Sequence, residues 1–69
     1  MARLWTVRAG NGEILENFAA ASRLEVGRKL VPTRFDAFRF RVSSSYREHF
    51  ERTLARILDR ECWEIVRVR

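Results

Sequence analysis

Residues 38–42 read Phe-Arg-Phe-Arg-Val and residues 65–69 read Ile-Val-Arg-Val-Arg, so both segments alternate apolar residues with arginine. Successive side chains of a β-strand point to opposite faces of a sheet, so this period of two predicts strands over 35–42 and 62–68. Each strand would have one apolar face and one cationic face. If both strands lie in one sheet, their arginines share a basic surface.

Residues 3–9 read as a further strand, in which Trp5 and Val7 share one face. The Gly-Asn-Gly sequence at residues 10–12 is a turn signal that could close a hairpin. The apolar residues at positions 14, 18 and 21 fit helical spacing better, and alanines lie between them. We therefore expect a helix over about 13–23.

The clearest helical pattern lies between the two arginine-alternating segments. Ser45 followed by Glu48 is a capping box, which predicts that a helix over about 46–60 begins there. Its apolar stripe repeats at helical spacing and contains Tyr46, Phe50, Thr53, Leu54, Ile57 and Leu58.

The expected order of elements is therefore β-α-β-α-β over a single domain of residues 1–69. This is a small α+β domain in which two helices pack on one face of a three-stranded sheet. Helical connections are long enough for crossovers between parallel strands, but purely parallel sheets seldom leave a face bare. Parallel and antiparallel pairing both remain open.

A chain of 69 residues buries only about 60% of the surface that its unfolded form exposes, so its core is small. The faces that the elements share predict a core of Val7, Phe18, Phe38, Phe40, Phe50, Leu54, Ile57 and Leu58. Cys62 is the single cysteine, which excludes an internal disulfide, and we expect it to be a small core residue. Small domains without such a cross-link often rely on a partner, so we expect self-association as a homodimer or a tight complex.

The composition indicates a folded, cytoplasmic protein. Apolar residues make up 46% of the chain, too many for a disordered segment, and no run approaches the roughly 20 apolar residues of a membrane helix. Arg3 and Arg8 interrupt the first apolar residues, which is unlike a signal peptide. We therefore expect no membrane partner.

The chain carries a net charge of +5, from 13 arginines and one lysine against nine acids. Guanidinium groups suit phosphate and carboxylate ligands because they are planar forks of donors. Arginine-biased codons in a GC-rich genome would produce the same ratio, so the composition leaves both explanations open.

The candidate binding surface is the cationic face of the predicted sheet, with one aromatic side chain among its arginines. Its members are Arg8, Arg39, Arg41, Trp63, Arg67 and Arg69. An open sheet that combines arginines for phosphates with an aromatic ring for stacking is typical of single-strand RNA and DNA binders. The alternative is that outward arginines are solvated, or protect strand edges from aggregation.

The other polar residues do not indicate a catalytic or metal site. Arg52, Arg56 and Arg60 form a row at helical spacing, which we interpret as a solvated face offset by neighbouring acids. His49 is the single histidine, has no partner for acid–base catalysis, and is expected on a helix surface. We predict no catalytic residue, no metal site and no cofactor.

The sequence thus favours a non-enzymatic binding module that binds a polyanion, nucleic acid above all, through an arginine-rich sheet face. The alternative is a small inhibitor or adaptor of the kind that phages and mobile elements encode. Such a protein would bind an acidic or nucleic-acid-binding surface of a host protein or nucleoprotein complex, such as a CRISPR or restriction complex.

Overall fold

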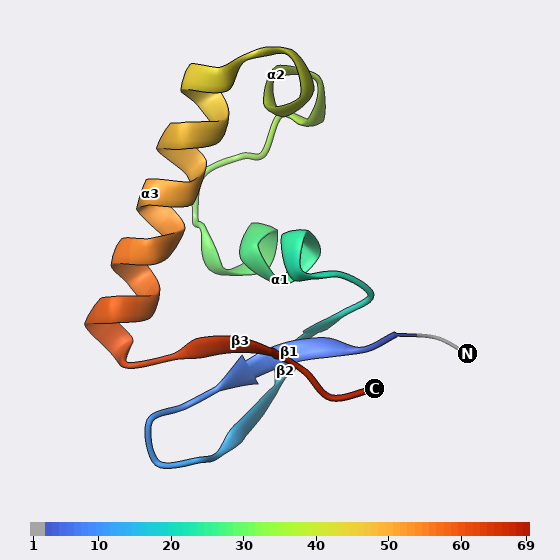
Figure 1. Cartoon of the computed structure of the whole chain (residues 1–69), viewed down its shortest axis with the longest axis vertical. Helices are drawn as coiled ribbons and strands as arrows, with labels where there is room; N and C mark the ends of the chain where they lie inside the picture. Colours follow the sequence, from blue (N-terminus) through green and yellow to red (C-terminus); the bar gives the residue numbers. More distant parts are fainter. Residues whose placement is uncertain (1–2) are drawn as a thin grey trace.

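The structure is a computed structural model that describes residues 3–69. Its elements are, in chain order, β1 (Trp5–Arg8), β2 (Ile14–Ala20), α1 (Arg23–Leu30), α2 (Ala37–Val42), α3 (Ser44–Glu61) and β3 (Glu64–Arg67) (Figure 1). The three strands form one open sheet in the order β2-β1-β3, and both pairings are antiparallel. The expected α+β class and three-stranded sheet are confirmed, but the order of elements is β-β-α-α-α-β.

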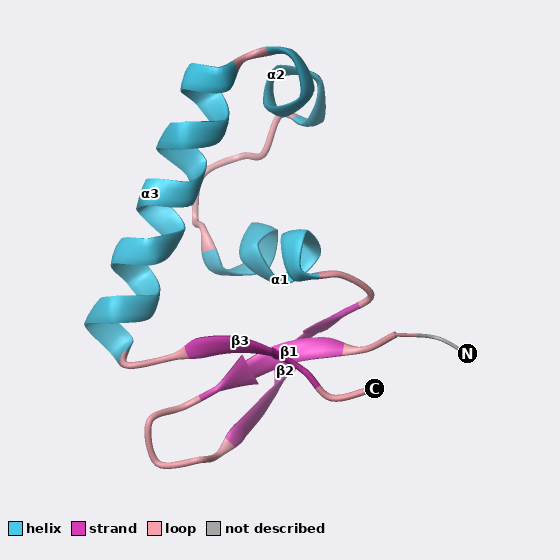
Figure 2. Ribbon diagram, in the orientation of Figure 1, coloured by secondary structure: helices cyan, strands magenta, loops and turns pink. Residues whose placement is uncertain are grey.

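The predicted helix over 13–23 is wrong, because residues Ile14–Ala20 form β2 instead (Figure 2). The turn signal before it closes a hairpin: Gly12 takes the left-handed conformation at φ 89°, which glycine adopts without steric cost. The Ala9 amide donates to the carbonyl of Glu13 at 2.8 Å. Pairing with β1 thus outweighs the helical preference of the alanine-rich segment, because propensity is only a weak local term.

Register decides which side chains share a face of the sheet. Val7 lies opposite Leu15 on β2 and opposite Ile65 on β3, and residues directly opposite one another point to the same side. Ile65 packs against the core that the helices form, so this is the helix-covered face. The opposite face, which the helices do not cover and which we call the bare face, includes Thr6, which is nevertheless buried, and Arg8, which is exposed (Figure 1).

The core lies where α1 and α3 meet above the helix-covered face. Val31, Phe50 and Leu54 are its buried centre, and Gly27 of α1 faces Leu54. Of the residues expected in the core, Val7, Phe50 and Leu54 are buried, while Phe18, Phe40, Ile57 and Leu58 are half-buried.

The helix over residues Ser44–Glu61 confirms the predicted long helix, but it begins earlier than the capping box indicates. Ser43 is its N-cap, and the Ser43 hydroxyl accepts a hydrogen bond from the Tyr46 amide at 3.2 Å. It ends at Cys62, which is exposed and adopts the left-handed conformation at φ 58°. The expectation that Cys62 is a core residue is therefore wrong.

The predicted strand over 35–42 is also wrong, because residues Ala37–Val42 form the short helix α2 (Figure 2). Asp36 is its N-cap, and its carboxylate accepts a hydrogen bond from the Arg39 amide at 3.0 Å. The alternation of phenylalanine and arginine therefore no longer separates two faces. Phe40 packs on the core, but Phe38, which was expected to be buried, is 68% exposed.

The six elements make a thin molecule in which α2 and part of α3 extend away from the sheet (Figure 1). The principal extents are 34 × 32 × 16 Å, and the radius of gyration is 12.3 Å. A fully compact domain of this length has a radius of gyration of about 11 Å. Among the helices within residues 3–69, none has both the length and the apolar character needed to cross a bilayer.

Candidate functional site

The arginines expected on one sheet face do not come together. Arg39 and Arg41 belong to α2, which has no place in the sheet. Arg8 points to the bare face and forms an ion pair with Glu64, the residue opposite it on β3. Arg67 lies opposite Trp5 and therefore points to the other side of the sheet. The predicted common basic face is thus wrong, since it depended on residues 35–42 being a strand.

Arg69 and Trp63 lie at either end of β3. The Arg69 carbonyl accepts from the amide of Leu4 at 3.2 Å and from Nε of Arg67 at 2.8 Å. Trp63 immediately precedes β3 and shares the helix-covered face with Ile65, two residues along the strand. Two of the six predicted residues line a hollow that also contains cations and aromatic rings. Arg39 lies with Arg34, Phe35 and Tyr46 beside α2, and Trp63 lies in a hollow next to the sheet.

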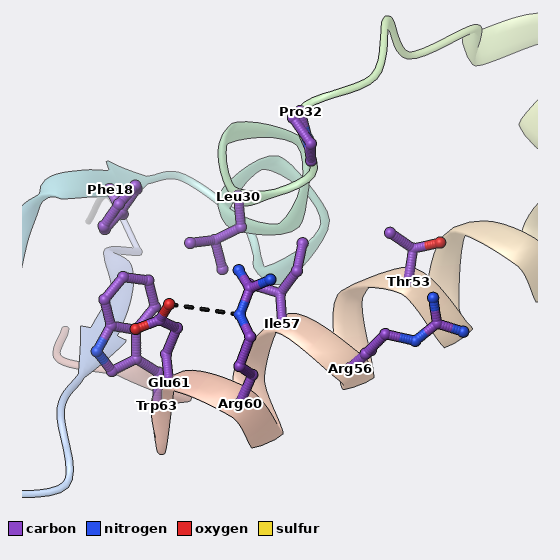
Figure 3. Close-up of a pocket in the computed structure, with 9 residues that line it drawn as sticks. All are labelled: Phe18, Leu30, Pro32, Thr53, Arg56, Ile57, Arg60, Glu61 and Trp63. Atoms are coloured by element: carbon purple, nitrogen blue, oxygen red, sulfur yellow. Dashed lines mark ion pairs between the residues drawn. The ribbon is translucent and has the colours of Figure 1, made fainter.

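This hollow, which we call the Trp63 hollow, lies where the C-terminal half of α3, the end of α1 and the sheet meet (Figure 3). Its volume is about 500 Å³. It is lined by Phe18, Leu30, Pro32, Thr53, Arg56, Ile57, Arg60, Glu61 and Trp63. It therefore combines an apolar and aromatic lining with charged groups.

The aromatic part of the hollow is a pair of rings from two different strand segments. The centroids of Phe18 and Trp63 are 5.6 Å apart, and the ring planes are inclined by 50°. The Trp63 amide donates to the carbonyl of Leu58 at 2.9 Å, so the end of α3 fixes the backbone that carries the indole. Such tilted pairs of aromatic rings are favourable beyond their buried area.

The cationic part comes from α3. Arg56 and Arg60 lie one helical turn apart, and both line the hollow. Figure 3 shows the Arg60 side chain extending toward Leu30 and Ile57, whereas the Arg56 side chain extends toward Thr53. Arg60 forms a 3.5 Å ion pair with Glu61, and both side chains remain substantially exposed, so the pair contributes little to stability.

Arg56 and Arg60 are site residues that the sequence interpretation missed. Their spacing was visible as a helical row with Arg52, but the row alone is equally consistent with a solvated surface. What gives it significance is Trp63, which the left-handed turn at Cys62 brings back beside the last turns of α3. That geometry depends on where the helix ends, which the sequence pattern did not define.

The chemistry available in the hollow is binding. An indole and a phenyl ring offer a surface for a planar apolar group, and the guanidinium groups offer donors to an anion attached to it. Within the described part of the chain, no three His, Cys, Asp or Glu side chains gather closely enough to hold a metal ion. His49 is exposed on α3, as expected, and does not line the hollow.

Comparisons of the chain with protein-family models, with curated proteins and with solved structures find no match.

Proposed function

We propose that this protein is a non-enzymatic binding module for single-stranded nucleic acid, and that the Trp63 hollow receives a base. The observation that carries the proposal is the shared hollow, in which the Phe18–Trp63 pair lies beside Arg56 and Arg60. Proteins that bind single strands without strict sequence preference combine aromatic stacking with a positively charged path for the backbone. The lining of the Trp63 hollow supplies both.

The arginines of α3 give the phosphates a path that leads into the hollow. Successive helical turns rise by about 5.4 Å, so Arg52, Arg56 and Arg60 present donors at regular intervals along α3. Within residues 3–69, Arg52 and Arg56 have no carboxylate within ion-pairing distance. Their guanidinium groups are therefore free to bind phosphate, while Arg60 exchanges its exposed partner Glu61 for the ligand.

The net charge of +5 supports the same function, because it favours encounter with a polyanion before specific contacts form. Affinity should accordingly fall as salt rises. The slope of log K against log salt is about −0.7 for each phosphate neutralised on a single strand. Two or three phosphates bound by α3 would give a slope of about −1.4 to −2.1.

The test is fluorescence anisotropy with a fluorescein-labelled twelve-nucleotide oligothymidylate, titrated with the purified protein at several salt concentrations. The double variant Arg56→Gln/Arg60→Gln should bind at least tenfold more weakly than the wild type. The matched control, Arg39→Gln/Arg41→Gln, removes the same charge from α2 and should weaken binding less than threefold. Equal losses in both variants would show that binding depends on overall charge and would refute the site.

Stacking on Trp63 has its own readout. The chain has two tryptophans, so Trp5→Phe leaves Trp63 as the single indole. Unlabelled oligonucleotide should then quench the remaining fluorescence in step with the anisotropy titration. Unchanged fluorescence at saturation would place the bound bases elsewhere.

A further inference from the structure

A second surface remains outside the proposed function, and it lies on α2. Phe38 and Val42 are 68% and 61% exposed, the highest exposures among the large apolar residues of the described chain. They are four residues apart, so they lie on the same side of α2, one turn from each other. They form an outward apolar pair on a helix that has no buried residue of its own.

Three contacts hold α2 in this orientation. The Asp36 amide donates to the Tyr46 hydroxyl at 2.8 Å, next to the start of the helix. At the other end, Nη1 of Arg47 donates to the carbonyls of Phe40 and Arg41, each at 2.9 Å. Both ends of α2 are thus hydrogen-bonded to side chains of α3, in an orientation that leaves the pair outward.

The inward side of α2 is already occupied. The Phe40 ring lies 5.3 Å from that of Phe35 and 5.6 Å from that of Phe50, measured between centroids. Phe38 therefore has no place in this aromatic cluster. The outward pair is a preformed surface, and a partner that covers it would not first have to reorder the helix.

The charges around the pair define the partner. At 100° per residue, Arg41 lies beside Phe38 on one flank, and Arg39 lies beside Val42 on the other. Within the described residues neither arginine has a carboxylate within 4 Å. The Arg39 guanidinium lies over the Tyr46 ring at 5.2 Å, which holds that flank in place. The apolar pair is thus bordered by cations on both sides.

We propose that α2 docks into an apolar pocket with an acidic rim on another protein, with Phe38 and Val42 inserted and Arg39 and Arg41 paired with carboxylates. A second copy of this chain fits poorly, because two α2 helices would bring like charges together in a chain of net charge +5. A membrane surface fits poorly as well, since two apolar side chains bury far less than stable anchoring requires.

The test uses two synthetic helical peptides of 18 residues with the same leucine face, one bordered by glutamate and the other by lysine. The glutamate peptide supplies the chemistry of an apolar surface with an acidic rim. It should bind the full chain with a dissociation constant below 100 µM by fluorescence anisotropy, and the lysine peptide should bind at least tenfold more weakly. Equal binding of both peptides, or none below 1 mM, would overturn the proposal.

Variants then locate the surface. The double variant Phe38→Ser/Val42→Ser should lower the affinity for the glutamate peptide at least tenfold and leave the affinity for oligothymidylate unchanged. Ile14→Ser is the matched control, because Ile14 is an exposed apolar residue on β2, at 41% exposure, and should have no effect. Equal peptide affinity in the wild type and the α2 double variant would refute the assignment.

Two further measurements address the other occupants. Sedimentation velocity that shows a dimer dissociated by Phe38→Ser/Val42→Ser would assign the surface to a second copy and overturn the proposal. Co-sedimentation with phosphatidylglycerol vesicles that depends on the same two residues would assign it to a membrane, with the same consequence. If the protein is a monomer, does not co-sediment with the vesicles and binds the glutamate peptide, the results support docking of α2 into an apolar pocket with an acidic rim.

Discussion

Replacing Gly27 with alanine sets two opposing effects against each other at the contact between α1 and α3. A Cβ at position 27 would lie 3.0 Å from Cδ2 of Leu54, closer than ordinary van der Waals contact. Leu54 is 1% exposed and packs within the core, so it has little room to yield. Alanine gains about 1 kcal/mol over glycine in a helix, while overpacking a core costs about 1–3 kcal/mol. Gly27→Ala should therefore destabilise the wild type by up to about 2 kcal/mol.

The sign should reverse when Leu54 is shortened. In a Leu54→Ala background Cδ2 is absent, and the nearest remaining atom, Cζ of Phe50, would lie 3.5 Å from the new Cβ, an ordinary contact. Only the helix-forming advantage of alanine then remains, so Gly27→Ala should stabilise this background by about 1 kcal/mol. The two substitutions should couple by about 1–3 kcal/mol, which is the overpacking cost that the double variant avoids.

The assay is urea denaturation followed by far-ultraviolet circular dichroism on the wild type, both single variants and the double variant. Leu54→Ala alone costs about 3–5 kcal/mol, which can unfold a domain of this size. If the Leu54→Ala variant is unfolded, the Leu54→Val variant, which also lacks Cδ2, serves as the background in its place. A coupling below about 0.5 kcal/mol would mean additive sites, and the close approach of α1 to α3 at Gly27 would then be refuted.

Two further predictions concern the end of α3. Cys62→Gly should increase the free energy of unfolding by about 0.5–1 kcal/mol, because glycine removes the strain of a side chain at φ 58°. The midpoint of thermal unfolding should rise accordingly, and a lower midpoint would argue against the left-handed end of the helix. Glu61→Gln should increase the affinity for oligothymidylate two- to fivefold at low salt, because a carboxylate that competes for Arg60 is lost. The gain should shrink at 0.5 M salt, and an unchanged affinity at low salt would place the phosphates away from Arg60.

The sequence predicts the elements whose local signals agree with their packing. The strands around residues 5–8 and 64–67 and the long helix α3 agree with the prediction. On β1 and α3 the apolar pattern matches the buried face, whereas on β3 the alternation does not, because Arg67 shares the helix-covered face with Ile65. The α+β class follows from these elements alone. The sequence does not predict the hairpin, because the spacing of Ile14 and Phe18 fits a helix until the pairing with β1 is known.

Residues 35–42 show why the remainder could not be predicted. Alternation over five residues is short enough to arise in a helix, and the contacts that decide the matter come from distant residues. The side chains of Tyr46 and Arg47 hydrogen-bond to the backbone at the two ends of α2, and the ring of Phe40 packs against that of Phe50. The predicted basic sheet face is wrong for the same reason, because it requires residues 35–42 to form a strand and the chain forms α2 there.

The order in which the chain is synthesised bears on how the sheet assembles. β1 is central to the sheet, yet one of its neighbours is the adjacent β2 and the other is β3, with Trp5 paired to Arg67. The hairpin can form early from local contacts, whereas β1 keeps one unpaired edge until residues 64–67 leave the ribosome. Such distant pairings slow folding, and an open edge in the meantime is a template for association with other nascent chains. The edge of β1 that faces β3 is therefore protected only once Glu64–Arg67 has paired with it.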